Sequence, residues 1–300
     1  MLAVWGPLAS WQEILAMSRA AEHVGLDSVW VPDHLIMGGQ TDEPPATHEA
    51  WTMMSALAAA TDRISIGSLV ICARFRPPAV VAKMAATFDR IAPGRLILGV
   101  SAGSYEPEFE VFGLHTDRPV GRFEEWIEIL VRLLRGERLT FNGRYFSLRD
   151  AALAPPPENR IPILIGSTKP RMNGLTARWA DAWSFPPWHG APDDRTSDAV
   201  RTIDEALRAV GREPESLERT ASMIVRDPEQ AVGGEKLPAR WDNAFIGSVD
   251  ALAATLIEFA ERGFEQIVVK LQPATTRSVE RLGEAVRLAR GRAASSAHSI

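Results

Sequence analysis

A carboxylate and an imidazole stand side by side directly after an apolar run early in the chain. Residues 28–31 read Ser-Val-Trp-Val, and Asp33 and His34 follow after one proline. An imidazole titrates near neutral pH, so His34 is suited to moving a proton or to bonding a developing charge. Asp33 adds a hydrogen-bond acceptor beside it. The alternative is a structural role, in which Asp33 caps a turn and His34 packs.

A second group of candidates matches the Gly-x-Ser-x-Gly pattern of serine hydrolases at Gly99, Ser101 and Gly103. In those enzymes the serine occupies a sharp turn between a strand and a helix, and the catalytic histidine follows later in the chain. Here residues 104–107, Ser-Tyr-Glu-Pro, predict a loop instead of a helix. The later histidines are His115, His189 and His298. The other interpretation of Ser101, Ala102 and Gly103 is a strand end whose small side chains admit a flat ligand.

Gly166, Ser167 and Thr168 follow another apolar run and precede a helical pattern. Backbone amides, hydroxyl groups and the positive end of a helix at such a turn can hold a phosphate. The chain has neither the Gly-Lys-Ser/Thr segment of a P-loop nor the Gly-x-Gly-x-x-Gly fingerprint of a nicotinamide site. The histidines show no metal-ligand spacing, and Cys72 is the single cysteine, so the sequence predicts no metal and no internal disulfide.

These candidates lie at the ends of short apolar runs that alternate with helical patterns. The runs are continuous and rich in Ile, Val and Leu, as is typical of parallel strands covered on both faces. They comprise residues 2–5, 28–31, 64–71, 96–100, 162–165, 182–184, 220–225 and 266–271. Helices are predicted between them, for example from a capping box at Ser10 to Gly25 and from Pro78 to Ile91. The alternation indicates a closed barrel or an open doubly wound sheet, and the number of units favours the barrel.

Two kinds of segment interrupt this alternation. Residues 136–150 contain an Asn-Gly pair at 142–143, which predicts a β-hairpin with a tight turn. Residues 185–195 and 227–243 are long and rich in proline, glycine and charge, as binding loops and lids are. Since no linker divides the chain, the sequence predicts one domain over residues 1–290 and a loose tail over 291–300.

The composition argues against several classes of partner. The 300 residues are 46% hydrophobic and 24% charged, and the formal net charge is −5. Nucleic acids and anionic membranes attract basic proteins, so neither is expected as a partner. The longest apolar stretch, residues 64–73, is about half the length that crosses a bilayer, and no basic segment typical of a signal peptide begins the sequence. We expect a soluble, cytoplasmic protein.

Several segments, in this order, resemble the bacterial luciferase-like family of flavin- and F420-dependent oxidoreductases. They are Ser-Val-Trp-Val-Pro-Asp-His-Leu at 28–35, Ile-Gly-Ser-Leu-Val at 66–70 with Arg-Pro-Pro-Ala at 76–79, the stretch 85–100, and Pro-Ile-Leu-Ile-Gly-Ser at 162–167 followed by Ala-Asp-Ala-Trp at 180–183. The stretch 85–100 is the most distinctive. The resemblance covers most of the chain and implies a (β/α)8 TIM barrel of the α/β class, with the hairpin and long loops as insertion segments.

The resemblance also implies where a cofactor would bind. Reduced FMN or coenzyme F420 would lie across the carboxyl ends of the strands, with its phosphate near Gly166, Ser167 and Thr168. Its ring would contact Ser68, Leu69, Ser101, Ala102 and Gly103. Asp33 would contact the cofactor, and His34 would be the catalytic residue near the reacting centre.

Two local features follow from the same resemblance. A non-prolyl cis peptide bond is expected between Ser68 and Leu69, at the end of the third strand. The F420-dependent branch can carry a glutamate directly after the glycine of the fourth strand, and here that position is Ser104. Glu106 and Tyr105 are the candidates to replace the missing acidic group.

Two reaction classes remain open at this point. With F420 the enzyme would move a hydride to or from a small organic substrate, whereas with FMN, supplied by a partner flavin reductase, it would insert oxygen. The Asp33-His34-Leu35 ending resembles the F420 branch more closely, which favours F420 over FMN. The substrate would be selected by the variable loops 37–47, 185–195 and 227–243, which carry no recognisable motif. Family members are commonly dimers, so a homo-oligomer is expected.

Overall fold

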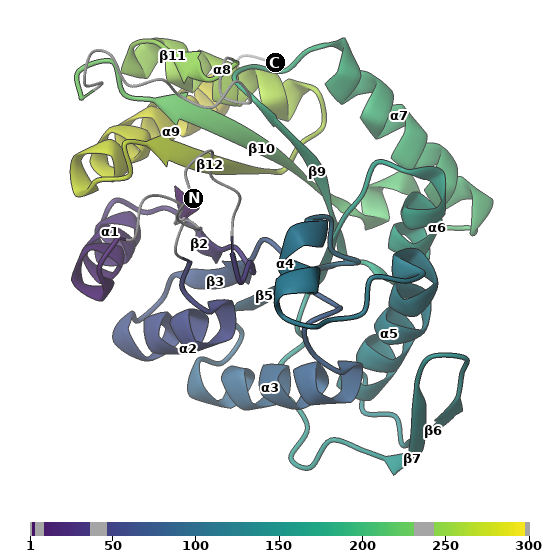
Figure 1. Cartoon of the computed structure of the whole chain (residues 1–300). Coiled ribbons are helices and arrows are strands. Elements are labelled where there is room, and N and C mark those ends of the chain that lie inside the picture. The colour runs from purple at the N-terminus through teal and green to yellow at the C-terminus, as the bar shows by residue number, and fades with distance from the viewer. Residues whose placement is uncertain (1, 4–8, 37–46, 231–242, 298–300) are drawn as a thin grey trace.

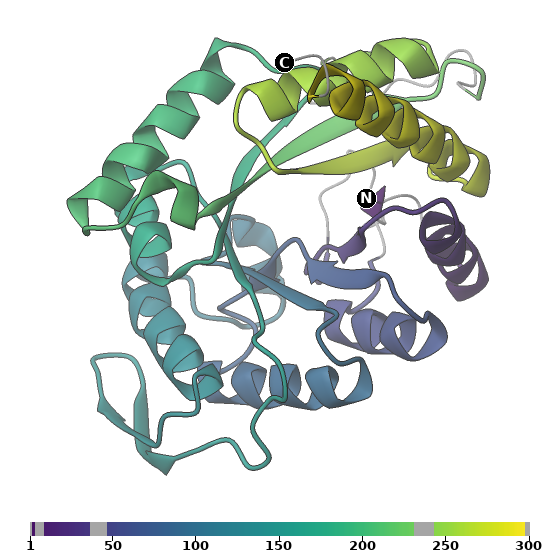
Figure 2. The same ribbon diagram turned by 180° about the vertical axis from the view of Figure 1, so that it is seen from behind.

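Short parallel strands alternate with helices in the computed structural model of the chain, which describes residues 2–3, 9–36, 47–230 and 243–297. The strands form a curled sheet, and the helices lie on its outer side (Figure 1; Figure 2). The predicted α/β class is therefore confirmed. Across the described segments, no helix is both long enough and apolar enough to cross a bilayer.

The strands of the curled sheet pair in parallel and largely in chain order. They are β1 (Leu2–Ala3), β2 (Ser28–Val31), β3 (Ser65–Ser68), β5 (Leu96–Ser101), β8 (Ile163–Gly166), β9 (Ala182–His189), β10 (Glu218–Arg226) and β12 (Gln266–Gln272). Each pairs with the next, and β12 also pairs with β1. Two short strands extend the sheet, β4 (Ile71–Cys72) beside β5 and β11 (Phe245–Ile246) beside β10. The carboxyl ends of these strands consequently share one edge of the sheet.

The helices occupy the connections between strands. They are α1 (Trp11–His23), α2 (Ala50–Ala60), α3 (Pro78–Ile91), α4 (Glu106–Val111), α5 (Pro119–Leu134), α6 (Pro170–Trp179), α7 (Asp194–Ala209), α8 (Val249–Glu261) and α9 (Thr276–Ala297), with a 3-10 turn at Pro214–Ser216. The predicted capping box is present at α1, where Ser10 and Glu13 bond reciprocally. Helix α3 begins at Pro78 as predicted, because a proline at the first helical position sacrifices no hydrogen bond.

Three buried tryptophans donate hydrogen bonds from the core, two of them to loops at the carboxyl edge of the sheet. Trp30 of β2, Trp126 of α5 and Trp183 of β9 are fully buried. Each indole N–H donates a hydrogen bond, to Ser28 Oγ at 2.8 Å, to the Arg76 carbonyl at 2.9 Å and to the Ser167 carbonyl at 2.9 Å, respectively. Buried indoles normally find such partners. The last two bonds attach core side chains to the loops that follow β4 and β8.

The apolar run 64–71, predicted as one strand, is divided. Strand β3 ends at Ser68 and β4 begins at Ile71, and the peptide bond between Leu69 and Val70 is cis. The expected cis bond between Ser68 and Leu69 is therefore wrong by one position. The Leu69 amide still donates to the Val31 carbonyl at 2.9 Å, so the regular strand geometry continues through the Ser68–Leu69 bond.

The predicted hairpin is present but turns differently. Strands β6 (Leu139–Asn142) and β7 (Ser147–Ala151) pair antiparallel, and Asn142 lies opposite Ser147. The connection therefore spans residues 143–146 instead of a two-residue Asn-Gly turn. The Glu125 carboxylate of α5 accepts the backbone N–H groups of Arg144, Tyr145 and Phe146. A contact distant in sequence thus fixes this turn.

Two predicted irregular segments contain regular structure. Strand β9 continues to His189 beside β10, so the first part of the predicted loop 185–195 is strand. Helix α9 continues to Ala297, so residues 291–297 are helical instead of the start of a loose tail. Residues 37–46 and 231–242, which form most of the other predicted substrate loops, lie outside the described residues.

Candidate functional site

A cavity of about 440 Å³ opens at the carboxyl edge of the curled sheet. Its lining residues follow β2, β3, β5 and β8 or lie within β4, β9 and β10. In α/β folds this edge is where ligands bind. Every site residue predicted from the sequence lines the cavity except Ser68, namely Asp33, His34, Leu69, Ser101, Ala102, Gly103, Gly166, Ser167 and Thr168.

Ser68 is buried inside the sheet instead. Its side chain is fully inaccessible, and its hydroxyl donates to the Gly99 carbonyl of β5 at 2.8 Å. A Cβ at Gly99 would lie 2.0 Å from the Ser68 carbonyl oxygen, so the two strand ends approach more closely than any other residue would allow. Ser68 therefore helps to hold β3 against β5, and its side chain does not line the cavity.

His34 is held by a buried glutamate from α4. Its Nδ1 lies 3.2 Å from Glu108 Oε1, and the other carboxylate oxygen of Glu108 accepts the Leu35 backbone N–H at 3.0 Å. Glu108 is 1% exposed, whereas the His34 side chain is 24% exposed and lines the cavity. With the carboxylate accepting from Nδ1, the opposite ring nitrogen, Nε2, is directed away from Glu108 and is an acceptor in the neutral ring.

Glu108 is the functional candidate that the sequence did not reveal. The expected replacements for the acidic group at Ser104 were Glu106 and Tyr105. Glu106 instead pairs with Arg74 at 3.2 Å and is 53% exposed, and Tyr105 meets the His34 ring edge-on with the centroids 6.4 Å apart. In the sequence, Glu108 is followed directly by Phe109, which is also buried.

Asp33 forms a second buried ionic contact below the same cavity. Its carboxylate accepts the Cys72 backbone N–H at 2.9 Å and two bonds from Arg76, at 2.7 and 3.1 Å. Arg76 also pairs with Glu49. Burial opposes the charge of Arg76, but the bonds with Asp33 and Glu49 raise the pKa of its guanidinium above the ordinary value. This pair therefore ties the end of β2 to the loop after β4.

The one cysteine of the chain contributes to the cavity wall without being reactive. Cys72 is 3% exposed and lines the cavity beside Asp33. Burial raises the pKa of its thiol to about 12, and the nearby charges of Asp33 and Glu108 act in the same direction. Since the thiolate is the nucleophilic form, Cys72 is inert near neutral pH.

The other end of the cavity is formed by the turn between β8 and α6. A Cβ at Gly166 would meet no atom within 4 Å, so open space lies above this residue. The Ser167 hydroxyl donates to Asn173 Oδ1 at 2.7 Å, whereas Thr168 and Lys169 are exposed. Helix α6 begins here with no side chain bonded to its first amides. The start of a helix beside the exposed Lys169 is suited to a phosphate group, and Lys169 was missed from the sequence.

Ser101 does not have the surroundings of a hydrolytic nucleophile. Its hydroxyl oxygen accepts the Gly103 backbone N–H at 3.2 Å, and Gly103 has a φ of +83°. A Cβ at Gly103 would lie 2.6 Å from the Cys72 sulfur and 2.8 Å from Phe109, so only glycine fits. The chain continues as a loop before α4 begins at Glu106. The strand-to-helix elbow of serine hydrolases is thus lacking at this position.

Comparison with known proteins agrees with this arrangement. Residues 3–236 match the family model described as luciferase-like monooxygenase. An F420-dependent glucose-6-phosphate dehydrogenase of Microbacterium testaceum (strain StLB037) is 33% identical over 210 residues, which cover 67% of this chain and 60% of the relative. A phthiodiolone/phenolphthiodiolone dimycocerosates ketoreductase of Mycobacterium kansasii is 35% identical over 218 residues, covering 66% and 59%. The match therefore spans about three fifths of these two curated relatives.

A solved structure extends the similarity to nearly the whole fold. An F420-dependent secondary alcohol dehydrogenase in complex with an F420-acetone adduct superimposes with a TM-score of 0.79 at 20% identity, covering 96% of this chain and 98% of that one. At this identity the likeness concerns the fold. The family match covers most of the chain, from β1 through β10. The chain therefore belongs to the luciferase-like monooxygenase family.

Proposed function

We propose that this chain is an F420-dependent oxidoreductase that transfers a hydride to or from a small organic substrate. The observation that carries the proposal is the cavity itself, which has a His34–Glu108 pair at one end and an uncapped helix start beside Lys169 at the other. Relatives and a structural neighbour named as F420-dependent enzymes support it. The architecture that we propose for it is a (β/α)8 barrel, supported by the pairing of β9 with β10 and of β12 with β1.

The residues that line the cavity fit a planar cofactor that carries a phosphate. Ala102 and Gly103 have little or no side chain, so a flat ring can approach the strand ends closely, beside Leu69 and Ser101. The turn at 166–169 would hold the phosphate with backbone amides, the hydroxyl of the exposed Thr168 and the positive charge of Lys169. Coenzyme F420, when bound, supplies a two-electron hydride carrier that reacts poorly with oxygen. The protein supplies orientation and electrostatics.

The proton transfer that accompanies hydride transfer is assigned to His34. In alcohol oxidation, Nε2 of His34 would accept the proton of the substrate hydroxyl, and in carbonyl reduction it would return a proton to that oxygen. The Glu108 carboxylate fixes the ring by its 3.2 Å contact with Nδ1 and stabilises the imidazolium that forms. Asp33 fixes the cavity wall near His34 through its bonds with Arg76 and the Cys72 amide. We propose that Asp33 also contacts the bound cofactor.

The names of the relatives and the positions of Asp33 and His34 favour F420 over FMN as the cofactor. The curated relatives include several F420-dependent glucose-6-phosphate dehydrogenases. Asp33 and His34 follow β2 at the positions where the F420 branch carries its cofactor-contacting and reacting residues. A hydrolase is not supported, because the turn after Ser101 lacks the required helix.

Turnover under strictly anaerobic conditions tests this proposal. Purified enzyme is mixed with oxidised F420 and a panel of secondary alcohols and sugar phosphates, and with reduced F420 and the corresponding carbonyl compounds. We expect at least one donor to reduce F420 without oxygen, and His34→Ala to abolish most of that rate. Oxygen-dependent product formation with reduced FMN, and no F420 turnover with any donor, would overturn the proposal.

A further inference from the structure

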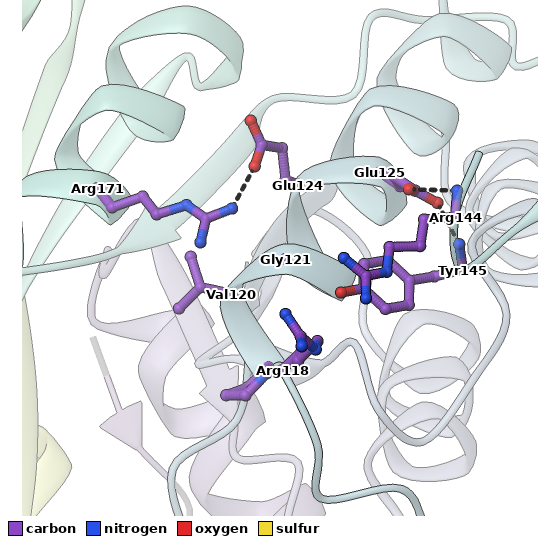
Figure 3. Close-up of a pocket in the computed structure, with 9 residues that line it drawn as sticks. Arg118, Val120, Gly121, Glu124, Glu125, Arg144, Tyr145 and Arg171 are labelled. Atoms are coloured by element: carbon purple, nitrogen blue, oxygen red, sulfur yellow. Dashed lines mark hydrogen bonds and ion pairs between the residues drawn. The ribbon is translucent and has the colours of Figure 1, made fainter.

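A second cavity, of about 460 Å³, lies where the tip of the β6–β7 hairpin packs against the start of α5 (Figure 3). Three arginines from separate segments line it: Arg118 before α5, Arg144 in the hairpin connection and Arg171 in the first turn of α6. The hydroxyl of Tyr145 lies against Gly121, where a Cβ would be only 3.3 Å away. We call this feature the arginine pocket.

The positive charge of the arginine pocket is only partly neutralised. Arg171 pairs with Glu124 at 2.6 Å. The Glu125 carboxylate is occupied by backbone N–H groups of the hairpin connection, at 2.7 to 3.0 Å. Within the described part of the chain, neither Arg118 nor Arg144 pairs with a carboxylate, and Arg144 lies over the Tyr145 ring at 5.5 Å. Two guanidinium groups are thus available to an anion.

The arginine pocket adjoins the cavity at the carboxyl edge of the sheet. Pro119 and Val120, in the first turn of α5, line both. Lys169, at the phosphate end of the first cavity, is two residues from Arg171 of the second. Arg171 therefore belongs to the same short segment as the phosphate end of the first cavity. The two cavities are thus neighbours, with Lys169 lining one and the three arginines lining the other.

We infer that the arginine pocket binds the oligoglutamate tail of coenzyme F420, an inference that rests on the proposed function. Beyond its phosphate, F420 continues as a lactyl group and a chain of γ-linked glutamates, each with a free carboxylate. Guanidinium groups bind carboxylates with two parallel hydrogen bonds, which suits Arg118 and Arg144 to this tail. The expected gain is modest because both arginines are exposed and such contacts are screened by solvent.

The inference is tested with two forms of the cofactor that differ only in the tail. Fluorescence titration gives Kd for F420 with a long glutamate tail and for F420-0, which has none. For the unaltered protein we expect the tail to tighten binding about fivefold. In the Arg118→Ala/Arg144→Ala variant this preference should disappear while Kd for F420-0 stays unchanged. The matched control is Arg138→Ala/Arg149→Ala, which removes the same charge from hairpin residues outside the pocket and should keep the preference.

The outcomes separate this inference from the proposed function. If F420-0 binds but the tail adds no affinity, or if the preference survives in the Arg118→Ala/Arg144→Ala variant, the arginine pocket is not the tail site. If neither form binds the unaltered protein, the proposed function itself fails. Added salt provides a check that needs no variant, because it should weaken the binding of long-tailed F420 more than that of F420-0.

Discussion

The two edges of the curled sheet use buried charge in different ways. At the amino edge, the Asp89 carboxylate accepts backbone N–H groups of Gly94, Glu158 and Asn159 at 2.7 to 2.9 Å. At the carboxyl edge, the buried carboxylates of Asp33 and Glu108 also contact ionisable side chains, Arg76 and His34. The Asp89 carboxylate therefore has a structural role, because it holds loop backbone through N–H groups that carry no charge of their own.

This difference in partners distinguishes a structural carboxylate from a functional one. Glu22 repeats the amino-edge pattern, since it accepts the backbone N–H groups of residues 62–64. Neither Asp89 nor Glu22 is among the residues that line the cavity at the carboxyl edge. Glu108, by contrast, is buried on one side and in contact with a partly exposed imidazole that lines the cavity. A carboxylate that orients a cavity-lining imidazole is an arrangement that recurs in catalytic sites.

The largest effect is expected at the carboxyl edge. His34→Ala should lower kcat at least about a hundredfold, because it removes the group assigned to proton transfer. Kd for F420 and the melting temperature should change little. Steady-state kinetics with the donor found by the anaerobic panel, together with thermal unfolding, measures all three quantities. If the variant retains most of its kcat, His34 is not the group that transfers the proton.

The opposite behaviour is expected at the amino edge. Asp89→Asn should lower the free energy of unfolding by about 2 kcal/mol, because an amide cannot replace all the bonds that the carboxylate accepts. The specific activity of the folded fraction should stay the same. Denaturant unfolding and a kinetic assay on the same preparation measure the stability and the activity of this variant. A lower kcat with an unchanged free energy of unfolding would contradict the structural role of Asp89.

The effect of Asp89 should also depend on pH. Burial opposes its charge, but the hydrogen bonds from Gly94, Asn159 and Glu158 hold the pKa of Asp89 below its ordinary value. A carboxylate with a lowered folded-state pKa contributes stability above its unfolded-state pKa of about 3.9, and loses it as the pH falls through the folded-state value. The stability gap between the unaltered protein and Asp89→Asn should therefore narrow below about pH 4. A gap that widens on acidification would contradict this assignment.

The phosphate end of the cavity sharpens the comparison further. Gly166→Asp places a negative side chain in the open space above the β8–α6 turn and should weaken F420 binding about tenfold, or ~1.4 kcal/mol. Gly174→Asp is a suitable control, because a Cβ at this helical glycine also meets no atom within 4 Å and the residue lies outside the cavity lining. Equal F420 affinities for the two variants would show that the phosphate does not bind next to Gly166.

The smallest effect is expected at Ser101. Ser101→Ala removes one hydroxyl that accepts a local bond from the Gly103 amide and should change F420-dependent turnover by less than about threefold. A fluorophosphonate probe should leave the unaltered protein unlabelled. Stoichiometric labelling of Ser101 would instead indicate an activated serine nucleophile and favour a hydrolytic function.

The sequence predicts those parts of the site that are local to a strand end. Asp33, His34 and the Gly166-Ser167-Thr168 turn each follow an apolar run directly, so alternation of strands and helices was sufficient to bring them to one edge. Ser68, which is still inside β3, bonds to the Gly99 carbonyl of β5 and does not line the cavity. The capping box at Ser10 and the helix start at Pro78 were predictable for the same local reason.

The parts of the site and fold that were not predicted depend on contacts between segments that are distant in the sequence. Glu108 reaches His34 only because α4 folds back over the strand ends, in front of the sheet in Figure 1. The hairpin connection is fixed by Glu125 of α5, and the arginine pocket gathers residues from three elements. No periodicity or spacing in one stretch of sequence encodes such contacts.

The central claim is that the cavity at the carboxyl edge is an F420 site, and parallel fluorescence titrations with F420 and FMN, in oxidised and reduced forms, test it most directly. The account predicts saturable binding of F420, with FMN weaker by at least about tenfold, and loss of F420 affinity in Gly166→Asp but not in Gly174→Asp. Tight binding of reduced FMN together with no measurable binding of F420 would contradict the account.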